Sequence, residues 1–594
     1  MRMWPWMTLP ARRVALGIIV LVVTVVSMAP ASVAAQVPRP RPPQITNVTP
    51  AITTPGGRIT ISGSFLRNPR AVTLSGISLA ITSASSKSIT VRAPSSAARG
   101  TITVFTEGGN ANGTRAVVVR PSVSASPLNG TPVGTVRLTG RGFVPGEPVD
   151  LSFDRTPLPG VIADGGGRFD TDITVPANAT PGRHVFRGQG RFSGVPAETR
   201  HFISVQWPQR GFVAGGNRYN RLENQITARN VAGLSLDWVG TTVSPVRSSP
   251  VVFDRTVYFG SDAGALLTLG VNCASNGRSC TPRALGLAGG AISSTPAAFG
   301  DAVIVGAEDG KLYSFERECP RSQRPCSPLW VATTGGPITS SPVIAGRRVV
   351  VGSEDGNVYA FDRDCAKNGR ECAPDWIGEI GAPVRSSPVV HDGVVYVGAD
   401  DGVLYAFPAG CANDGSTCRP DWIGETGGFV RSSPSVADGV VYVGSADTTV
   451  YGFPVDCERG GASCDPIWRG NADGIVTSTP AVALGKVVVG TASGAVMAFP
   501  IACRPTDAEA GCDPQWTGTT GGPVTSSAAI AGDMVYIGSE DGFIYGYPLE
   551  CRPAACRASW ASGLRGPIVA SPSVSNGSIF ISSEDGTVRS WSLP

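Results

Sequence analysis

Fourteen cysteines form the most specific chemical pattern in this 594-residue sequence, and they fall into seven close pairs. The pairs are Cys273/Cys280, Cys319/Cys326, Cys365/Cys372, Cys411/Cys418, Cys457/Cys464, Cys503/Cys512 and Cys551/Cys556. An even number of locally paired cysteines favours disulfides in a secreted chain. Zinc is disfavoured, because no Cys-x-x-Cys recurs and the chain has three histidines. We therefore predict seven local disulfides, each acting within its own hairpin loop, and no metal site.

Three arginines, Arg247, Arg385 and Arg431, lie three residues before an aligned position of a repeat, where the other copies mostly carry small or hydroxylated residues. A guanidinium group presents a planar fork that suits carboxylates. Each arginine either pairs with a nearby Asp or Glu of its own chain or contributes to an anion-reading patch. We predict that all three lie at the mouth of a ring, as candidate ligand-binding residues.

Residue types for catalysis are sparse in the repeats. His391 lies in the turn "VVHDGVV", which favours a solvated turn residue and supports a Ser-His-Asp triad poorly. Acidic turns such as Glu308-Asp309-Gly310 could suggest calcium. Asp-Gly is also what a tight hairpin needs, and a calcium loop requires acidic groups at alternating positions. We predict no catalytic residue.

These residues sit on a repeat that is best aligned on its Ser-Ser-Pro phrase. The aligned positions are Pro250, Pro296, Pro342, Pro388, Pro434, Pro480, Ala528 and Pro572. Twelve residues before each lies a second marker: Trp238, Ala284, Trp330, Trp376, Trp422, Trp468, Trp516 and Trp560. Each period of about 45 residues predicts four strands, with Ser-Ser-Pro in the inner strand and Trp in the outer one. A four-stranded period of this length indicates a β-propeller blade.

The phase of the repeat predicts how the ring closes. Trp238 precedes the first inner strand, and the last period stops after its third strand. We therefore expect Leu234–Val239 to complete the last blade. Each cysteine pair falls between the third and fourth strands of its period, so the interrupted blade has none. The predicted fold is all-β, an eight-bladed β-propeller over residues 207–594 with two N-terminal immunoglobulin-like β-sandwich domains.

The N-terminal region predicts export. Arg12 and Arg13 precede an apolar run and a small-residue site, which is the layout of a signal peptide over residues 1–35. An uncleaved membrane anchor is the alternative reading. Residues 36–43 form a Pro-rich linker. We expect a secreted, extracellular or cell-envelope protein with no membrane span after signal cleavage.

Two segments with short alternating strands follow, over residues 44–120 and 121–206. The stretch from Pro50 to Phe65, P-x-x-x-x-P-G-G-x-I-T-I-S-G-x-F, resembles the TIG family of immunoglobulin-like domains. The second segment is similar to bacterial immunoglobulin-like domains. Both are interpreted as spacers or as adhesion modules.

The repeat "TGGPITSSPVIAGRRVVVGSEDGNVYAFD" resembles that of pyrroloquinoline-quinone-type propellers, and the segment from Trp207 to Trp238 resembles their usual lead-in. That group includes quinoprotein alcohol dehydrogenases and a non-enzymatic propeller of the outer-membrane barrel-assembly machinery. The usual D-x-x-T-G link is replaced here by the cysteine loop. The chain has neither the Cys-Cys dipeptide of those dehydrogenases nor a Cys-x-x-Cys-His motif.

These features favour a binding or scaffold protein without catalytic activity or cofactor. The alternative is a quinone-dependent oxidoreductase with a divergent site, which would use pyrroloquinoline quinone and calcium. The net charge of +4 and a charged fraction of 16% argue against nucleic acid as a partner. We expect a monomer that binds a protein or cell-envelope ligand of acidic character.

Overall fold

The computed structural model describes residues 39–180, 182–319, 325–365, 370–411, 415–457, 462–503, 511–552 and 554–594. The predicted signal peptide and the first three linker residues lie outside these ranges. The regular secondary structure of the described chain consists of β-strands and one short 3-10 helix, η1 (Val231–Gly233), which confirms the all-β prediction. None of its helices has the length and apolar character needed to cross a bilayer.

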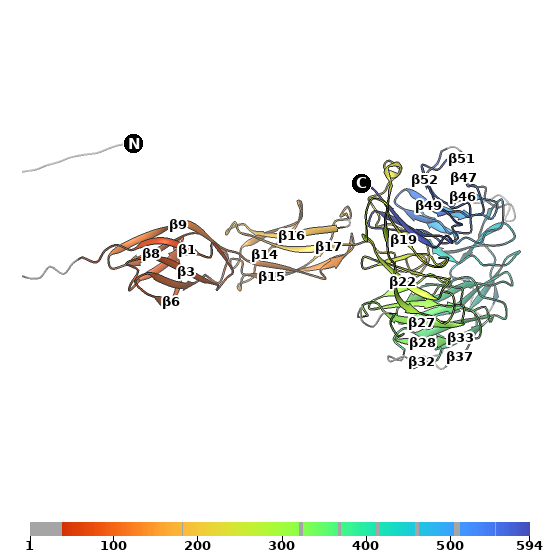
Figure 1. Ribbon diagram of the computed structural model, residues 1–594, viewed down its shortest axis with the longest axis horizontal. Helices are drawn as coiled ribbons and strands as arrows, with labels where there is room; N and C mark the ends of the chain where they lie inside the picture. The colour runs from red at the N-terminus through yellow and green to blue at the C-terminus, as the bar shows by residue number, and fades with distance from the viewer. Residues whose placement is uncertain are drawn as a thin grey trace, which may run out of the picture. The chain divides into compact units, whose positions relative to one another are not determined.

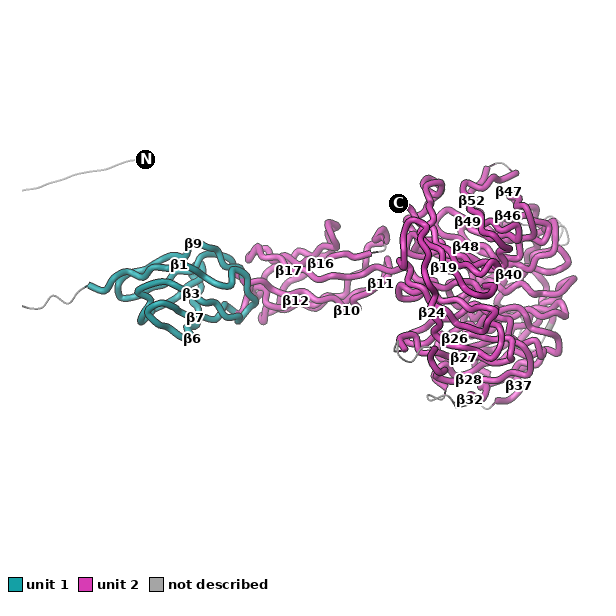
Figure 2. The backbone as a smooth tube through the Cα atoms, viewed as in Figure 1, with its two compact units in different colours: residues 1–94, 99–118 teal, residues 95–98, 119–594 magenta. Residues whose placement is uncertain are grey.

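Two compact units make up the chain: Met1–Pro94 with Arg99–Val118, and Ser95–Ala98 with Val119–Pro594 (Figure 2). The first is a sandwich of sheets β1-β3-β7-β6 and β2-β9-β8-β4-β5. Inward residues such as Ile59 and Ile61 are fully buried and alternate with more exposed neighbours. The strands are β1 (Gln44–Thr49), β2 (Ile52–Thr53), β3 (Arg58–Ser64), β4 (Ala71–Leu74), β5 (Ile77–Ser78), β6 (Ala80–Ala84), β7 (Ser88–Arg92), β8 (Ala98–Thr106) and β9 (Gly109–Val119).

The second unit begins with another sandwich, of sheets β10-β12-β15 and β11-β17-β16-β13-β14. Phe143, Phe153 and Phe186 lie in its core. Its strands are β10 (Ser122–Ser126), β11 (Asn129–Gly130), β12 (Thr135–Arg141), β13 (Pro148–Phe153), β14 (Thr156–Ile162), β15 (Arg168–Thr174), β16 (Gly182–Gly190) and β17 (Pro196–Ile203). The division of this unit into separate domains stays a prediction.

The repeats fold into eight antiparallel sheets among the described residues, each with four strands from the inside outwards. The inner strands are β20 (Val251–Phe253), β25 (Ala297–Phe299), β29 (Val343–Ala345), β34 (Val389–His391), β39 (Ser435–Ala437), β44 (Ala481–Ala483), β48 (Ala529–Ala531) and β53 (Ser573–Ser575). We had expected Ser-Ser-Pro to lie in the inner strand, but it precedes that strand. Proline has no N–H for a ladder, and the serine hydroxyls bond elsewhere.

The two middle strands of each sheet are mostly buried, because adjacent sheets cover both of their faces. The second strands are β21 (Thr256–Gly260), β26 (Ala302–Gly306), β30 (Arg348–Gly352), β35 (Val394–Gly398), β40 (Val440–Gly444), β45 (Lys486–Gly490), β49 (Met534–Gly538) and β54 (Ser578–Ser582). The third strands are β22 (Ala265–Gly270), β27 (Lys311–Glu316), β31 (Asn357–Asp362), β36 (Val403–Pro408), β41 (Thr449–Pro454), β46 (Ala495–Pro500), β50 (Phe543–Pro548) and β55 (Thr587–Ser592).

The outer strands carry the aligned tryptophans in seven of the eight sheets. They are β24 (Arg283–Leu287), β28 (Trp330–Thr333), β33 (Trp376–Glu379), β38 (Trp422–Glu425), β43 (Trp468–Asn471), β47 (Trp516–Thr519), β52 (Trp560–Gly563) and β19 (Ser235–Thr241).

The ring closes where the start of the repeat region meets its end. Strand β19 pairs antiparallel with β55, so a segment upstream of the first inner strand completes the last sheet (Figure 1). The closing strand runs one residue later at its start and two residues later at its end than the predicted Leu234–Val239. The inner strands touch in cyclic order, from β20 through β53 and back to β20.

Candidate functional site

The inner edge of every sheet in the ring is bound by one continuous segment, residues 207–220. Trp207 and Val252 exchange two backbone hydrogen bonds of 2.8 Å. Further round, the N–H groups of Ala298, Ile344, Val390, Val436, Val482 and Ile530 donate to this segment, and Asn220 donates to Val574. The last two residues form strand β18 (Tyr219–Asn220) beside β48. We call residues 207–220 the lead-in circuit, because they cover the eight inner edges in turn.

A second ring lies on the mouth side of the lead-in circuit and consists of the second hydroxyl of each Ser-Ser-Pro phrase. Ser341 N donates to Ser387 Oγ at 2.8 Å, and Ser387 N donates to Ser433 Oγ at 2.9 Å. The same bond links further neighbours, such as Thr479 N to Ser527 Oγ. These hydroxyls therefore tie adjacent sheets together round the axis.

Two arginines of the lead-in circuit reach into the axis. Arg218 is 1% exposed and donates to the backbone carbonyls of Ala528, Ser527 and Pro572. Arg210 is half-buried, and its Nη1 contacts the hydroxyls of Ser387 and Ser433. Burial lowers the pKa of Arg210 to about 10, so the group stays charged at neutral pH. Burial, followed by the charge of Arg210, lowers the pKa of Arg218.

The predicted mouth arginines lie beside acidic residues of their own ring. Arg247 contacts Asp262 at 2.7 Å and Glu584 at 3.6 Å. Arg385 contacts Asp400 and lies 2.9 Å from Glu354. These ion pairs match the reading in which each arginine pairs within the chain.

Arg431 extends this pairing to the next sheet. It donates to both oxygens of Asp400, at 2.9 and 3.1 Å, and the bond raises the pKa of the guanidinium. Its guanidinium group also lies over the ring of Phe429, 4.3 Å from the ring centre, which fixes the side chain further. Arg385 and Arg431 are thus brought together through one carboxylate, whereas Arg247 pairs separately. Ligand binding by the three arginines stays a prediction.

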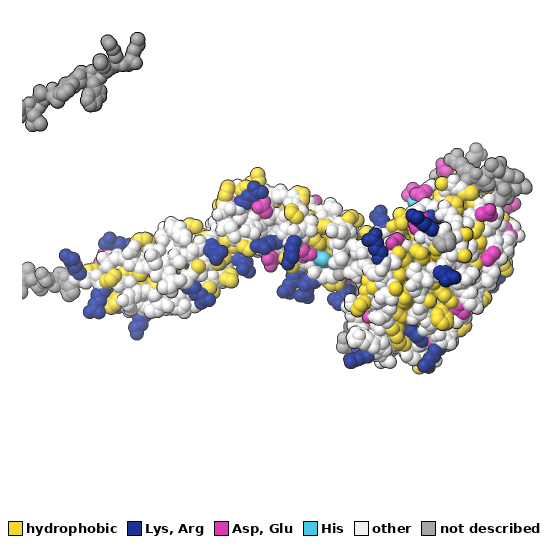
Figure 3. All heavy atoms as spheres, turned by 90° about the horizontal axis from the view of Figure 1, so that it is seen from above, with side chains coloured by type: hydrophobic (Ala, Val, Ile, Leu, Met, Phe, Trp, Pro, Cys, Tyr) yellow, Lys and Arg dark blue, Asp and Glu magenta, His cyan; other side chains and the backbone are white. Residues whose placement is uncertain are grey.

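Acidic residues form a regular girdle at the same mouth. Six of the eight repeats have one fifteen residues after the mouth position: Asp262, Glu308, Glu354, Asp400, Glu540 and Glu584. In the repeats that have such an acidic residue and carry Ser or Thr at the mouth position, the Ser or Thr hydroxyl donates to the acidic side chain, as Thr339 does to Glu354 at 2.9 Å. On the face drawn in Figure 3, acidic and basic side chains are interspersed over the repeats.

The aspartates of the tight turns have a structural role. Asp355 accepts hydrogen bonds from Tyr359 Oη at 2.7 Å and from Gly335 N of the preceding connection at 2.6 Å. The same arrangement recurs at Asp309, Asp447 and Asp541. Burial, and then the bond to Asp309, raises the pKa of Tyr313 to about 12. Within the described residues, no group of three His, Cys, Asp or Glu side chains could hold a metal ion.

The structure contains the seven predicted disulfides, with Cα–Cα distances from 5.8 to 6.4 Å. Each closed loop also reaches the outer edge of the preceding sheet. It adds a parallel strand there in five cases: β23 (Arg278–Cys280), β32 (Arg370–Cys372), β37 (Ser416–Cys418), β42 (Ala462–Ser463) and β51 (Ala555–Cys556). In the other two cases the loop makes only an isolated parallel β-bridge with the outer strand, between Cys326 and Gly286 and between Cys512 and Gly470. We call these loops clasps.

The disulfides link locally, as predicted, but the burial of the second cysteine in each pair shows that the loops they close also contact the neighbouring sheet. Cys464 is 3% exposed and packs in one hydrophobic cluster with Trp422 and Phe453. Its N–H donates to Ile423 O of the preceding sheet at 2.7 Å. Cys464 therefore lies in the seam between two sheets and not on an exposed loop, because the clasp carries it onto the neighbouring edge. The second cysteines of the other clasps are buried too: Cys280, Cys326, Cys372, Cys418, Cys512 and Cys556.

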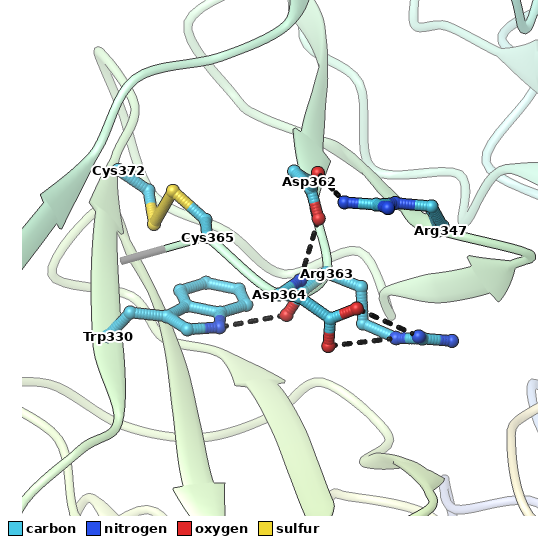
Figure 4. The surroundings of a disulfide bond; sticks show 7 residues. All are labelled: Trp330, Arg347, Asp362, Arg363, Asp364, Cys365 and Cys372. Carbon is cyan, nitrogen blue, oxygen red and sulfur yellow. Dashed lines mark hydrogen bonds and ion pairs between the residues drawn. A yellow bond between two sulfur atoms is a disulfide. The ribbon is translucent and has the colours of Figure 1, made fainter. Parts of the chain in front are cut away.

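In several clasped sheets a tryptophan of the outer strand contacts the clasp from the other side; the edge of β24, which carries Ala284, has no such residue. Trp330 Nε1 donates to Arg363 O of the next sheet at 3.0 Å, two residues before Cys365 (Figure 4). Cys372, at the far end of the same loop, lies opposite Ala332, two residues after Trp330. Trp238 and Trp516 make the equivalent bond. The regular spacing of Trp and Cys along the chain therefore reflects contacts between neighbouring sheets.

One outer edge has no clasp among the described residues. Strand β52 ends its sheet, because the following repeat is interrupted by the ring closure and carries no cysteine pair. In β47, the equivalent Thr517 N donates to Ala554 O of a clasp at 2.7 Å. Its counterpart in β52, Ala561, is exposed, and Ser562 is more exposed than the buried residue found at that position in the other Trp-bearing strands. The edge of β52 is thus open to strand pairing.

Arg210, Arg218 and the edge of β52 were not among the sites predicted from the sequence. Arg210 and Arg218 lie in the lead-in segment from Trp207 to Trp238, and their place at the axis depends on the path of that segment round the closed ring. The missing eighth cysteine pair was visible in the sequence, but its consequence for β52 follows only from the contact of each clasp with the preceding sheet. His391 lies at the end of β34 as a partly exposed residue, 3.5 Å from Asp392.

Comparison with known proteins gives two family matches. The family described as outer membrane protein assembly factor BamB matches residues 327–417 and 376–502, and the IPT/TIG domain family matches residues 43–117. The chain therefore carries a pyrroloquinoline-quinone-type repeat propeller preceded by an immunoglobulin-like domain, as predicted. A search of curated proteins found no match.

Several solved structures resemble this one. BamB from Moraxella catarrhalis is 16% identical with a TM-score of 0.45, and 60% of this chain covers 99% of it. Quinohemoprotein alcohol dehydrogenase from Comamonas testosteroni is 14% identical with a TM-score of 0.49, and 66% of this chain covers 80% of it. The computationally designed Ika8 protein is 15% identical with a TM-score of 0.47, and 60% of this chain covers all of it.

The charge network at the mouth predicts the effect of removing its arginines. Changing Arg385 and Arg431 together to Gln leaves the mostly buried Asp400 without a counter-charge. We expect a loss of about 1–2 kcal/mol in the free energy of unfolding at low salt, and less at high salt. Urea denaturation measures it.

The matched control is Arg347→Gln, which removes the exposed ion pair with Asp362 and should lower the stability less than the double variant does. A double variant as stable as the parent chain, but with weaker and less salt-dependent affinity for an acidic ligand, would favour the anion-reading patch instead.

Proposed function

We propose that this chain is a secreted or cell-surface binding and scaffold protein without catalytic activity. Its disulfide-stapled propeller serves as the interaction platform, and the open edge of β52 receives an extended segment of a partner protein. The observation that carries this proposal is the contrast, within the described residues, between the seven clasped outer edges and the eighth, which has no clasp.

The clasps indicate what kind of segment fits the open edge. Within the chain, short extended strands pair in parallel with the outer strands through main-chain hydrogen bonds. At β52 the matching backbone groups of Ala561 face outwards with no strand beside them in the described chain. Strand addition to an exposed edge is a common mode of peptide recognition. The edge therefore suits an extended peptide.

Charge near β52 favours an acidic segment. Arg557 precedes the strand and Arg565 follows it; both are exposed, and neither forms an ion pair within the described residues. Arg589 donates to Gly563 O at 3.0 Å, but it is paired with Asp585 at 3.3 Å, so the unpaired positive charge near the strand comes from Arg557 and Arg565. Like-charged surroundings would repel a basic segment and attract an acidic one. This agrees with the acidic partner expected from the sequence.

The oxidoreductase alternative requires a site for a tricyclic quinone. The axial cavity between the lead-in circuit and the hydroxyl ring measures about 20 Å³, which suits a water-sized species, whereas cofactor pockets usually span several hundred Å³. Its described lining includes Ser, Thr and Pro residues before the inner strands, a few Val and Ala side chains, Gln209 and two arginines. The residues at the axis therefore do not fit the quinone, and we derive no reaction through it.

The alternative predicts an activity that the binding proposal does not. We expect the purified protein, incubated with pyrroloquinoline quinone and calcium, to show no dye-linked alcohol oxidation above the protein-free control. Absorbance of the repurified protein checks for retained quinone. A stoichiometric quinone complex with dye-reducing turnover would replace the binding proposal by the oxidoreductase.

The open edge predicts binding that depends on a single N–H group. Ala561→Pro removes the outward N–H but no internal bond, because edge strands tolerate proline where the N–H faces solvent. As a probe we choose an oxidised, fluorescent peptide with the sequence of residues 503–514, a clasp that contains three acidic residues and one arginine. Fluorescence anisotropy should show binding to the parent chain and at least tenfold weaker binding to the proline variant.

Ala561→Ser is the matched control, because it changes the side chain and keeps the N–H; its affinity should equal that of the parent chain. Changing Arg557 and Arg565 to Gln should weaken binding and reduce its dependence on salt. Equal affinity for the parent chain and Ala561→Pro, or no binding to either, would contradict strand addition at β52.

A further inference from the structure

The axis of the ring holds more hydrogen-bond donors than acceptors. Ser387 Oγ accepts from Ser341 N and from Arg210 Nη1, and Ser433 Oγ accepts from Ser387 N and from the same guanidinium nitrogen. Each hydroxyl then still has its own O–H to donate, and the described chain supplies no acceptor for it. The other N–H groups of Arg210 are also available, because its hydrogen bonds involve Nη1 alone.

Thr479 gives a second, independent indication that a ligand binds at this position. It occupies the hydroxyl position of the next repeat, is 3% exposed and lines the axial cavity together with Arg210, Ser387 and Ser433. Its Oγ1 is buried and has no hydrogen-bond partner in the described chain. A buried hydroxyl without a partner is destabilising unless something bonds to it. The cavity thus contains an unused donor beside an unused guanidinium edge.

The positive charges at the axis also lack negatively charged partners among the described residues. Arg210 and Arg218 lie close together, with Arg218 Nη1 donating to Arg210 O at 2.6 Å. Neither forms an ion pair with a described Asp or Glu, whereas the mouth arginines all do. Buried charges in proteins are normally paired, because removal from water is costly. Arg218 donates to four backbone carbonyls, whereas Arg210 contacts only hydroxyl groups, so a negative charge beside Arg210 would stabilise the pair.

We propose that one halide-sized anion, of which chloride is the physiological example, binds at the axis of the ring. Arg210, Ser387, Ser433 and Thr479 would donate hydrogen bonds to it, and Arg218 would add positive charge from behind. The cavity of about 20 Å³ has room for a single water-sized species. Phosphate, sulfate and carboxylate ligands are larger, so size selects a monatomic anion.

The anion would connect two separate parts of the ring. Arg210 belongs to the lead-in circuit, whereas Ser387, Ser433 and Thr479 belong to three successive repeats. An anion held by both would fasten the circuit to the sheets that it covers. It would therefore stabilise the closed ring, whether or not the edge of β52 binds a partner.

Thermal unfolding tests this proposal on the full chain. The melting temperature is measured from 1 to 300 mM chloride, with gluconate replacing chloride at constant ionic strength. An anion that binds the native state alone raises the melting temperature with the logarithm of its concentration. We expect this rise for chloride and bromide, and not for sulfate or phosphate.

Variants locate the effect. Thr479→Val keeps the shape of the side chain and removes the donor, and should weaken chloride affinity about tenfold; Arg210→Gln should abolish the chloride dependence. Thr477→Val is the matched control, since Thr477 lies two residues away in the same repeat and does not line the cavity. It should leave the chloride dependence unchanged. Because Arg210→Gln could also impair folding, Thr479→Val decides the outcome.

Crystals soaked in sodium bromide give a direct check. We expect an anomalous peak within hydrogen-bond distance of Arg210 and Thr479, absent in Thr479→Val crystals. The proposal is overturned by equal melting temperatures in chloride and gluconate, by an equal effect of sulfate or phosphate, by full chloride dependence in Thr479→Val, or by bromide peaks only elsewhere.

Discussion

Every sheet of this ring has two edges whose N–H and C=O groups need hydrogen-bond partners, and the structure depends on how those edges are covered. A four-stranded sheet that left both edges open would expose templates for aggregation. At the inner edges the lead-in circuit supplies a partner for each of the eight inner strands. At the outer edges seven clasps do the same. Closure by β19 and β55 makes both arrangements possible.

The two candidate sites follow from these solutions. Covering the inner edges brings Arg210 and Arg218 to the axis, where the hydroxyl ring already directs donors inwards. Covering the outer edges takes one loop from each following repeat. The repeat cut by the closure lacks that loop, so β52 remains open. An anion at the axis and a strand at the rim would each complete a pattern that the rest of the ring already shows.

Much of this arrangement could be predicted from spacing. The position of Trp238 ahead of the first inner strand gave the closing strand to within two residues, and the two cysteines per period gave the disulfide pairing. The alignment left two interpretations of Arg385 and Arg431 open, and their ion pairs with Glu354 and Asp400 match the one in which they pair within the chain. The clasps could not be predicted, because sequence separation shows that Cys457 lies near Cys464 but not that Cys464 is buried against the preceding sheet. The path of the lead-in circuit likewise depends on the closed ring, so the axial place of Arg210 had no local signal.

Hydrogen exchange of backbone amides tests most directly whether the clasps cover the outer edges and leave one open. The amides of Thr517 and Ala561 occupy equivalent positions, one bonded to a clasp and the other facing outwards. In the isolated protein, Thr517 should exchange orders of magnitude more slowly than Ala561, whose N–H should exchange as an exposed edge group does. Equal protection of both amides, or rapid exchange at Thr517, would contradict the assignment of the cysteine loops as edge covers.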